Sequence, residues 1–130
     1  MESSIRDGVG YRQQMIMQCI WEADTSLTVA EIIDMLEEKC GQRFATSTIT
    51  TLCIGLQKKN LLQLGKKRGH AYTYEALIGE EEFRQEEIQR MKKITFGGSM
   101  SDMVVSLLPT EKMEQEEIDY LHRILEKYEK

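Results

Sequence analysis

The chain has 130 residues, of which 41% are hydrophobic and 30% are charged, and its formal net charge is −5. This composition is typical of a folded globular protein and excludes the low hydrophobicity of disordered chains. No apolar run approaches the roughly 20 residues that span a bilayer, and residues 1–7 lack the apolar segment of a secretory signal. We therefore expect a cytoplasmic protein that is not inserted in a membrane.

Two amphipathic helices are predicted near the N-terminus. Apolar residues recur at helical spacing over residues 10–22, which predicts the first helix. Thr28 and Glu31 have the identities and spacing of a capping box, so the second helix should begin at Thr28. An amphipathic stripe continues from there to Cys40, and Gly41 is a natural C-terminal stop.

A third helix is predicted over residues 44–59, although five of the six residues from Thr46 to Thr51 carry a hydroxyl group. Such residues favour strands, but the apolar residues share one helical face. That face consists of Ile49, Leu52, Cys53 and Leu56. The opposite face consists of Ser47, Thr50, Thr51, Ile54 and Lys58. Small hydroxyl side chains allow the close approach that a DNA groove requires; the alternative is a Thr-rich helix without a partner.

A basic β-hairpin is predicted after the third helix. Residues 61–64 and 71–74 look like strands, and Gly65–His70 joins them as a Gly-flanked basic turn. Three helices followed by a basic hairpin is the element order of a winged helix-turn-helix. In that fold the third helix enters the major groove and the hairpin contacts the DNA backbone nearby.

Charge is distributed unevenly along the chain. Between Lys39 and Tyr74 there are seven basic residues and no Asp or Glu over 36 positions. Residues 79–130, in contrast, carry 13 acidic and 8 basic residues. A polyanion responds to a local positive field and not to the total charge. The middle of the chain is therefore predicted to contact nucleic acid; a solvated basic face is the alternative.

The composition becomes acidic and helical beyond Ile78. Helices are predicted from Glu80 to about Phe96, from Ser99 to Pro109 and from Gln115 to Tyr128. They are too short to form a large core alone, so we expect them to pack against a second copy of the chain. Packing onto the N-terminal domain is the alternative. The residues assigned to the dimer interface are Phe83, Ile88, Met91, Ile94, Met103, Val104, Leu107, Leu108, Ile118, Leu121 and Leu125.

The predicted fold is mostly α-helical with a small β-hairpin wing. Residues 1–78 are expected to form a winged-helix DNA-binding domain and residues 79–130 a helical dimerisation domain. The residues expected to meet base edges are Ser47, Thr50, Thr51 and Ile54. The residues expected to contact phosphates are Thr46 and Thr48 through their hydroxyls, and Arg43, Lys58, Lys59, Lys66, Lys67, Arg68 and His70.

Five segments then stand out by their order and spacing: Cys19–Trp21, Ser47–Leu52, Leu56–Leu62, Gly69–Tyr74 and Gly98–Val104. Together with the acidic helix that links them, they resemble the BlaI/MecI/CopY family of penicillinase-type repressors over about Gly8–Tyr128. The resemblance implies a homodimeric repressor that binds a dyad-symmetric operator. It also implies release through cleavage by a membrane sensor peptidase or, in the copper-responsive branch, by metal.

Three departures from the family bear on function. The family often has Lys or Arg where this chain has Ser47, Thr50 and Gly55, so the operator sequence is expected to differ. The chain ends without the pair of C-x-C motifs of the copper-responsive branch, so no metal is expected. The scissile Asn-Phe step of the family corresponds to Ser106-Leu107, and these residues do not by themselves support cleavage.

Enzymatic function has little support in the sequence. G-x-G-x-x-G, a Walker loop, H-E-x-x-H and a Ser/His/Asp set are all absent, so we expect neither an enzyme nor a cofactor. Cys19, Cys40 and Cys53 form no C-x-x-C pair and are expected to be small core residues. The competing function is a winged-helix protein-interaction module or adaptor that does not bind an operator.

Overall fold

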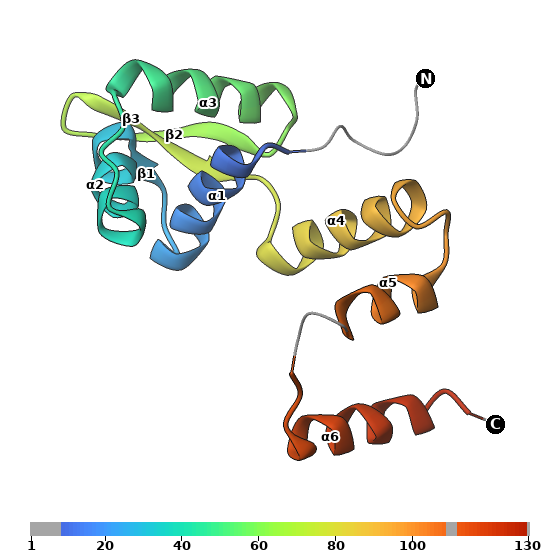
Figure 1. The fold of residues 1–130 in the computed structure, drawn as a ribbon. Coiled ribbons are helices and arrows are strands. Elements are labelled where there is room, and N and C mark those ends of the chain that lie inside the picture. Colours follow the sequence, from blue (N-terminus) through green and yellow to red (C-terminus); the bar gives the residue numbers. More distant parts are fainter. Residues whose placement is uncertain (1–8, 109–111, 130) are drawn as a thin grey trace. The chain divides into compact units, whose positions relative to one another are not determined.

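The computed structural model describes residues 9–108 and 112–129 (Figure 1). The chain divides into two compact units, Met1–Arg90 and Met91–Lys130. The elements in chain order are α1 (Tyr11–Ala23), β1 (Leu27–Thr28), α2 (Val29–Cys40), α3 (Thr46–Lys58), β2 (Leu62–Arg68), β3 (Ala71–Ala76), α4 (Glu80–Ile94), α5 (Met100–Leu107) and α6 (Gln115–Glu126). The predicted class, mostly helical with a small β wing, is confirmed.

Helix α2 begins where its capping box predicts. The backbone N–H of Glu31 donates to Thr28 Oγ1 at 3.1 Å, and the backbone N–H of Thr28 donates to Glu31 Oε1 at 2.9 Å. Gly41 ends the helix with a φ of +76°, which is in the left-handed region that glycine adopts without strain. The start of α5 is also as predicted, since Ser99 Oγ accepts from the backbone N–H of Asp102 at 3.1 Å.

The core of the N-terminal unit is formed by one face of each of the first three helices and by the adjoining strands. Ile49, Cys53 and Leu56 of α3 are completely buried, as the helical spacing predicts. They pack with fully buried residues of α1 and α2, including Ile16 and Ile32. Burial of this apolar face outweighs the strand preference of the hydroxyl residues, because β-propensity depends strongly on context.

The sheet is larger than predicted and its turn is shorter. Strand β1, which was not predicted because it has only two residues, pairs with β3, and the strand order is β1-β3-β2. Strand β2 continues to Arg68, which pairs with Ala71, so the loop is only Gly69-His70. The predicted basic turn over Gly65–His70 is therefore wrong, because Lys66–Arg68 belong to the strand. The ladder is irregular between Leu64 and Lys67.

A buried hydroxyl stabilises this irregular stretch. Thr73 is 1% exposed, and its Oγ1 donates to the backbone carbonyl of Lys66 at 2.6 Å. We expect Thr73→Val to lower the free energy of unfolding by about 1–3 kcal/mol, because the carbonyl loses a buried partner. Thr51→Val, at an exposed position on α3, should change it by less than about 0.5 kcal/mol. Urea unfolding of both variants tests this, and equal stability of the two would contradict it.

The start of α4 belongs to the N-terminal core. The rings of Trp21 and Phe83 lie 5.3 Å apart at their centroids, with an interplanar angle of 54°. Trp21 Nε1 also donates to the backbone carbonyl of Ile78 at 3.0 Å, which holds the residues before α4 on α1. Phe83 is only 6% exposed. Its assignment to the dimer interface was therefore wrong, because the side chain is covered within its own protomer.

The three cysteines occupy different environments. Cys19 and Cys53 are buried, as expected, whereas Cys40 is exposed at the end of α2, contrary to expectation. Burial raises the pKa of Cys53 to about 12 and that of Cys19 to about 11, because desolvation disfavours the thiolate. Both buried thiols are therefore protonated at neutral pH and serve as core residues.

The C-terminal unit contains α5, α6 and the end of α4. Neither α5 nor α6 buries a single residue within the described ranges 9–108 and 112–129. Side chains that were assigned to the dimer interface remain largely exposed, for example Ile94 at 68%, Val104 at 52% and Leu125 at 61%. Over the same described ranges, no helix is both long and apolar enough to cross a membrane.

Candidate nucleic-acid interface

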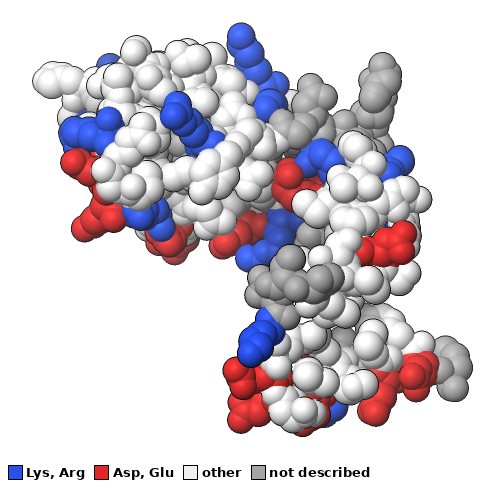
Figure 2. All heavy atoms as spheres, viewed as in Figure 1, with Lys and Arg blue, Asp and Glu red and all other residues white. Residues whose placement is uncertain are grey.

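Helix α3 presents a face without negative charge to solvent. Ser47 and Thr51 are exposed, Thr50 is half-buried, and Ile54 keeps 42% of its surface exposed. Lys58 is exposed in the last turn of the same helix. Figure 2 shows basic atoms and no acidic atoms over the upper part of the N-terminal unit, where Figure 1 places α3. The side chains on this face are small or uncharged up to Lys58, which is compatible with close approach to a DNA groove.

Helix α3 is held against α1 by Gln13, which sequence reasoning missed. Gln13 Nε2 donates to the backbone carbonyl of Leu52 at 3.4 Å, and Lys59 Nζ donates to Gln13 Oε1 at 2.9 Å. A Cβ atom on Gly55 would lie 2.6 Å from Gln13 Nε2. Gly55 thus allows the two helices to approach closely. Nothing in the local sequence indicates these contacts, because they join residues about 40 positions apart.

The N-terminal end of α3 combines exposed hydroxyl and backbone donors. Its N-cap, Ala45, offers no side-chain cap, so the first N–H groups of the helix remain available to an anion. Thr46 is exposed there and Thr48 is half-buried. The guanidinium of Arg12 lies 5.0 Å from the ring of Phe44, which brings a cation from α1 beside this end. Arg12 lies outside the basic stretch of the sequence and was therefore not predicted.

Ion pairs engage Arg43, Lys39 and Arg68 of the basic middle stretch. Arg43 Nη1 lies 3.0 Å from Asp34 Oδ1 and 2.6 Å from Glu37 Oε1, both on α2. Lys39 lies 2.6 Å from Glu22 Oε1. Arg68 pairs with Glu31 as well. Residues 39–74 contain no Asp or Glu, but carboxylates of α1 and α2 lie beside three of their basic side chains in the folded protein.

The lysines of α3 and the wing have other surroundings. Lys58 and Lys66 are exposed, and neither takes part in the ion pairs described above for this part of the chain. Lys67 Nζ lies 4.8 Å from the ring centroid of Tyr72 on the paired strand. His70 is exposed in the hairpin loop. These side chains and the exposed face of α3 are the candidate interface.

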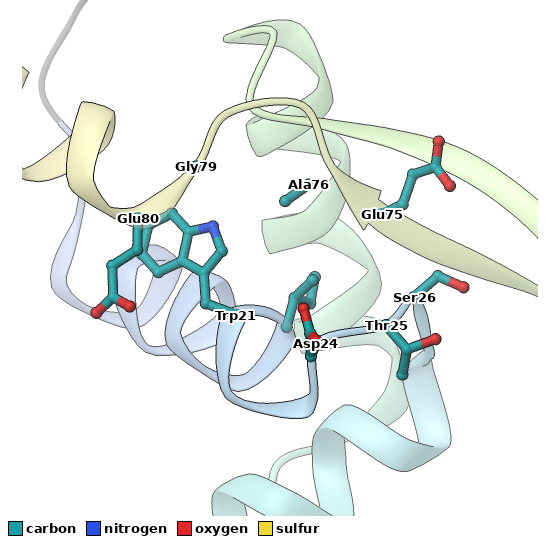
Figure 3. Close-up of a pocket in the computed structure, with 9 residues that line it drawn as sticks. Trp21, Asp24, Thr25, Ser26, Glu75, Ala76, Gly79 and Glu80 are labelled. Atoms are coloured by element: carbon teal, nitrogen blue, oxygen red, sulfur yellow. The ribbon is translucent and has the colours of Figure 1, made fainter.

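A cleft of about 510 Å³ lies elsewhere in the N-terminal unit, between the end of α1 and the end of β3. Figure 3 shows its side chains, with Glu75 and Glu80 at opposite ends and Trp21 and Asp24 between them. Three carboxylates and no basic residue line this cleft, so it is electrostatically unsuited to a phosphate. Among the described residues, no group of three or more His, Cys, Asp or Glu side chains is arranged to hold a metal ion.

Comparison with known proteins agrees with this geometry. The penicillinase repressor family matches residues 9–127. A complex structure of hsRosR-S4 is 13% identical, with a TM-score of 0.52, over 92% of this chain and 88% of that chain. A MarR family protein from Bacillus stearothermophilus is 22% identical, with a TM-score of 0.50, over 94% and 74%. At such identities the two structures show the fold alone.

No curated protein matches the chain. The family match, however, covers both the winged helix and the C-terminal helices. It is a family of transcription regulators and not of enzymes, which agrees with the DNA-compatible face of α3. The chain therefore belongs to the penicillinase repressor family and is a DNA-binding repressor of transcription.

Proposed function

We propose that the protein binds a dyad-symmetric operator as a homodimer in the cytoplasm, with α3 of each protomer in the major groove. The observation that carries this proposal is the exposed face of α3, which has no acidic residue and ends in Lys58. One recognition helix contacts only a few base pairs, whereas two helices about one DNA turn apart can recognise a palindrome. In this arrangement Ser47, Thr50, Thr51 and Ile54 meet base edges.

Ile54 is the base contact with the sharpest test. It is a large apolar side chain on a polar face, and it suits contact with a thymine methyl group. We expect Ile54→Ala to weaken operator binding by roughly tenfold while leaving binding to a random duplex unchanged. Fluorescence anisotropy with DNA from upstream of the gene and with a random duplex of equal length measures both. Equal losses on the two duplexes would exclude base recognition by Ile54.

Phosphate contacts are proposed for Lys58, Lys59, Lys66 and Lys67, aided by the hydroxyls of Thr46 and Thr48 and by His70. Arg43 is not among them, because its guanidinium is paired with Asp34 and Glu37. If about four lysines per protomer each neutralise one phosphate, log affinity of the dimer should fall with log salt concentration at a slope of roughly −7. Lys66→Ala combined with Lys67→Ala removes four contacts per dimer and should reduce the slope to roughly −3.5.

DNA titrations at potassium chloride concentrations on the order of 50 to 200 mM measure the slope of log affinity against log salt concentration for each variant. The matched control is Lys92→Ala with Lys93→Ala, an adjacent lysine pair at the end of α4, which should leave the slope unchanged. A wild-type slope near zero would contradict DNA binding and favour the protein-interaction adaptor.

Dimerisation is proposed through the apolar side chains of α5, α6 and the end of α4. What supports it is their exposure, because helices of a soluble protein normally bury such faces. The proposed contacts are Ile88, Met91, Ile94, Met103, Val104, Leu107, Leu108, Ile118, Leu121 and Leu125. A second copy of the chain is the proposed partner, since a dyad-symmetric site requires two recognition helices.

Release from the operator is proposed to occur by cleavage at Ser106-Leu107 by a membrane sensor peptidase; the support for this step is membership of the penicillinase repressor family and not the identity of the two residues. This step lies in the last turn of α5, so cleavage there separates α6 from the remainder of the protein. The cleaved protein would lose the apolar residues of α6 and, with them, part of the dimer interface. Mass spectrometry of the protein from induced cells tests the site, and an intact chain in induced cells would contradict it.

A further inference from the structure

We infer that Arg68 is a positioning residue that holds the wing in place for DNA, and that it does not itself neutralise a phosphate. This inference rests on the DNA-binding function proposed above. It assigns to Arg68 a role different from that of the neighbouring Lys66 and Lys67, although the three basic residues are consecutive in the sequence.

Both terminal nitrogens of Arg68 are bonded within the N-terminal unit. Nη1 donates to Glu31 Oε1, and Nη2 donates to the backbone carbonyl of Ser26 at 3.1 Å. The Arg68 side chain is 46% exposed and that of Glu31 is 39% exposed, so solvent only partly screens the pair. A guanidinium can make both contacts at once because its donors are arranged as a rigid fork. Lysine has no such geometry.

These two contacts tie the tip of the hairpin to the helix-turn-helix. Arg68 is the last residue of β2, directly before the two-residue loop. On its other edge, β3 pairs with only two residues of β1, Leu27 and Thr28, and these pair with Tyr74 and Thr73 and not with the residues at the tip of the hairpin. Glu31 Oε1 also accepts from the backbone N–H of Thr28, so the same oxygen atom caps α2 and holds the wing. The orientation of the wing is therefore coupled to the start of α2.

Replacing Glu31 distinguishes a positioning role of Arg68 from a direct phosphate contact, because the two roles predict opposite changes in DNA affinity. If Arg68 contacted a phosphate, removing the Glu31 carboxylate would free the arginine and remove a negative charge near DNA, so binding would become tighter. If Arg68 positions the wing, the same change weakens the contact that holds the hairpin, because a neutral amide attracts the guanidinium less than a carboxylate does, and DNA binding becomes weaker. Glu31→Gln is suitable because glutamine also forms a capping box, which leaves the start of α2 intact.

The test uses the 130-residue chain in anisotropy titrations over the same salt range. The DNA is a random duplex of about 30 base pairs, which is on the order of the length of the dimer site. We expect Arg68→Ala to weaken binding by roughly fivefold with an unchanged salt slope. Arg68→Lys should lose nearly as much affinity, since it keeps the charge but not the fork. Glu31→Gln should weaken binding about twofold or more, and the double variant Glu31→Gln/Arg68→Ala should bind no more weakly than Arg68→Ala.

Lys66→Ala is the matched control, since it should reduce the slope by about 2 for the dimer. A similar reduction by Arg68→Ala, full affinity of Arg68→Lys, or tighter binding by Glu31→Gln would each overturn the inference. Circular dichroism of each variant is the control that tests whether it is folded. A wild-type protein that binds no duplex would instead refute the proposed function, and the two failures are therefore distinguishable.

Discussion

Replacing Val104 and Leu125 together by Asp is expected to make the protein monomeric and to weaken operator binding by at least about 100-fold. These side chains are 52% and 61% exposed on α5 and α6, where the proposed dimer would bury them. A carboxylate placed in that interface must lose its hydration without a partner, which opposes association strongly. A monomer has one recognition helix for an operator with two half-sites, so it loses the additional affinity that the dimer gains from binding both half-sites at once.

Light scattering measures the oligomeric state and anisotropy measures the operator affinity of the same preparation. Ser106→Asp is the matched control. Ser106 is two residues after Val104, so its side chain lies on the opposite side of α5 and the new charge stays outside the proposed interface. It should remain dimeric. A dimeric Val104/Leu125 variant would place the interface elsewhere, and a monomeric variant with wild-type affinity would show that the dimer is not needed for operator binding.

Phe83→Ala is expected to lower the free energy of unfolding of the N-terminal unit by about 3–5 kcal/mol while leaving the dimer intact. The phenyl ring is 6% exposed and packs against Trp21, so its removal leaves a cavity beside the indole. Trp21 is the single tryptophan of the chain, so its fluorescence reports unfolding at this position directly.

Ile94→Ala, near the other end of α4, should give the reverse result. Ile94 is 68% exposed, so its truncation should change the fluorescence-detected stability by less than about 0.5 kcal/mol but weaken dimerisation. Sedimentation at several protein concentrations measures dimerisation for both variants. Loss of the dimer in Phe83→Ala, without loss of stability, would return Phe83 to the dimer interface.

Local sequence patterns were sufficient for most of the fold. The capping box at Thr28 and Glu31 predicts the start of α2, because its hydrogen bonds join residues three positions apart. The spacing of Ile49, Cys53 and Leu56 predicts a buried helical face despite their hydroxyl-rich neighbours. Periodicity of this kind reflects geometry within a single element, so it can be recognised without knowing what the element packs against.

Predictions that depended on distant partners were less accurate. Phe83 has helical spacing with the other apolar residues of α4, yet Trp21, 62 positions earlier, covers it. Strand β1 is too short to have a pattern and exists only because β3 pairs with it. The basic run Lys66–Arg68 was predicted to be a turn, but pairing with β3 extends the strand through it.

The sequence by itself determined the order of the helices and the hairpin, the apolar side of each helix and the acid-free composition of α3. Only the tertiary structure decided which cations remain available to DNA, since Asp34, Glu37 and Glu31 of α2 approach Arg43 and Arg68 through space. The physical reason is that helical periodicity acts between residues a few positions apart. Electrostatic attraction depends on distance in space, which the chain sets only when it folds.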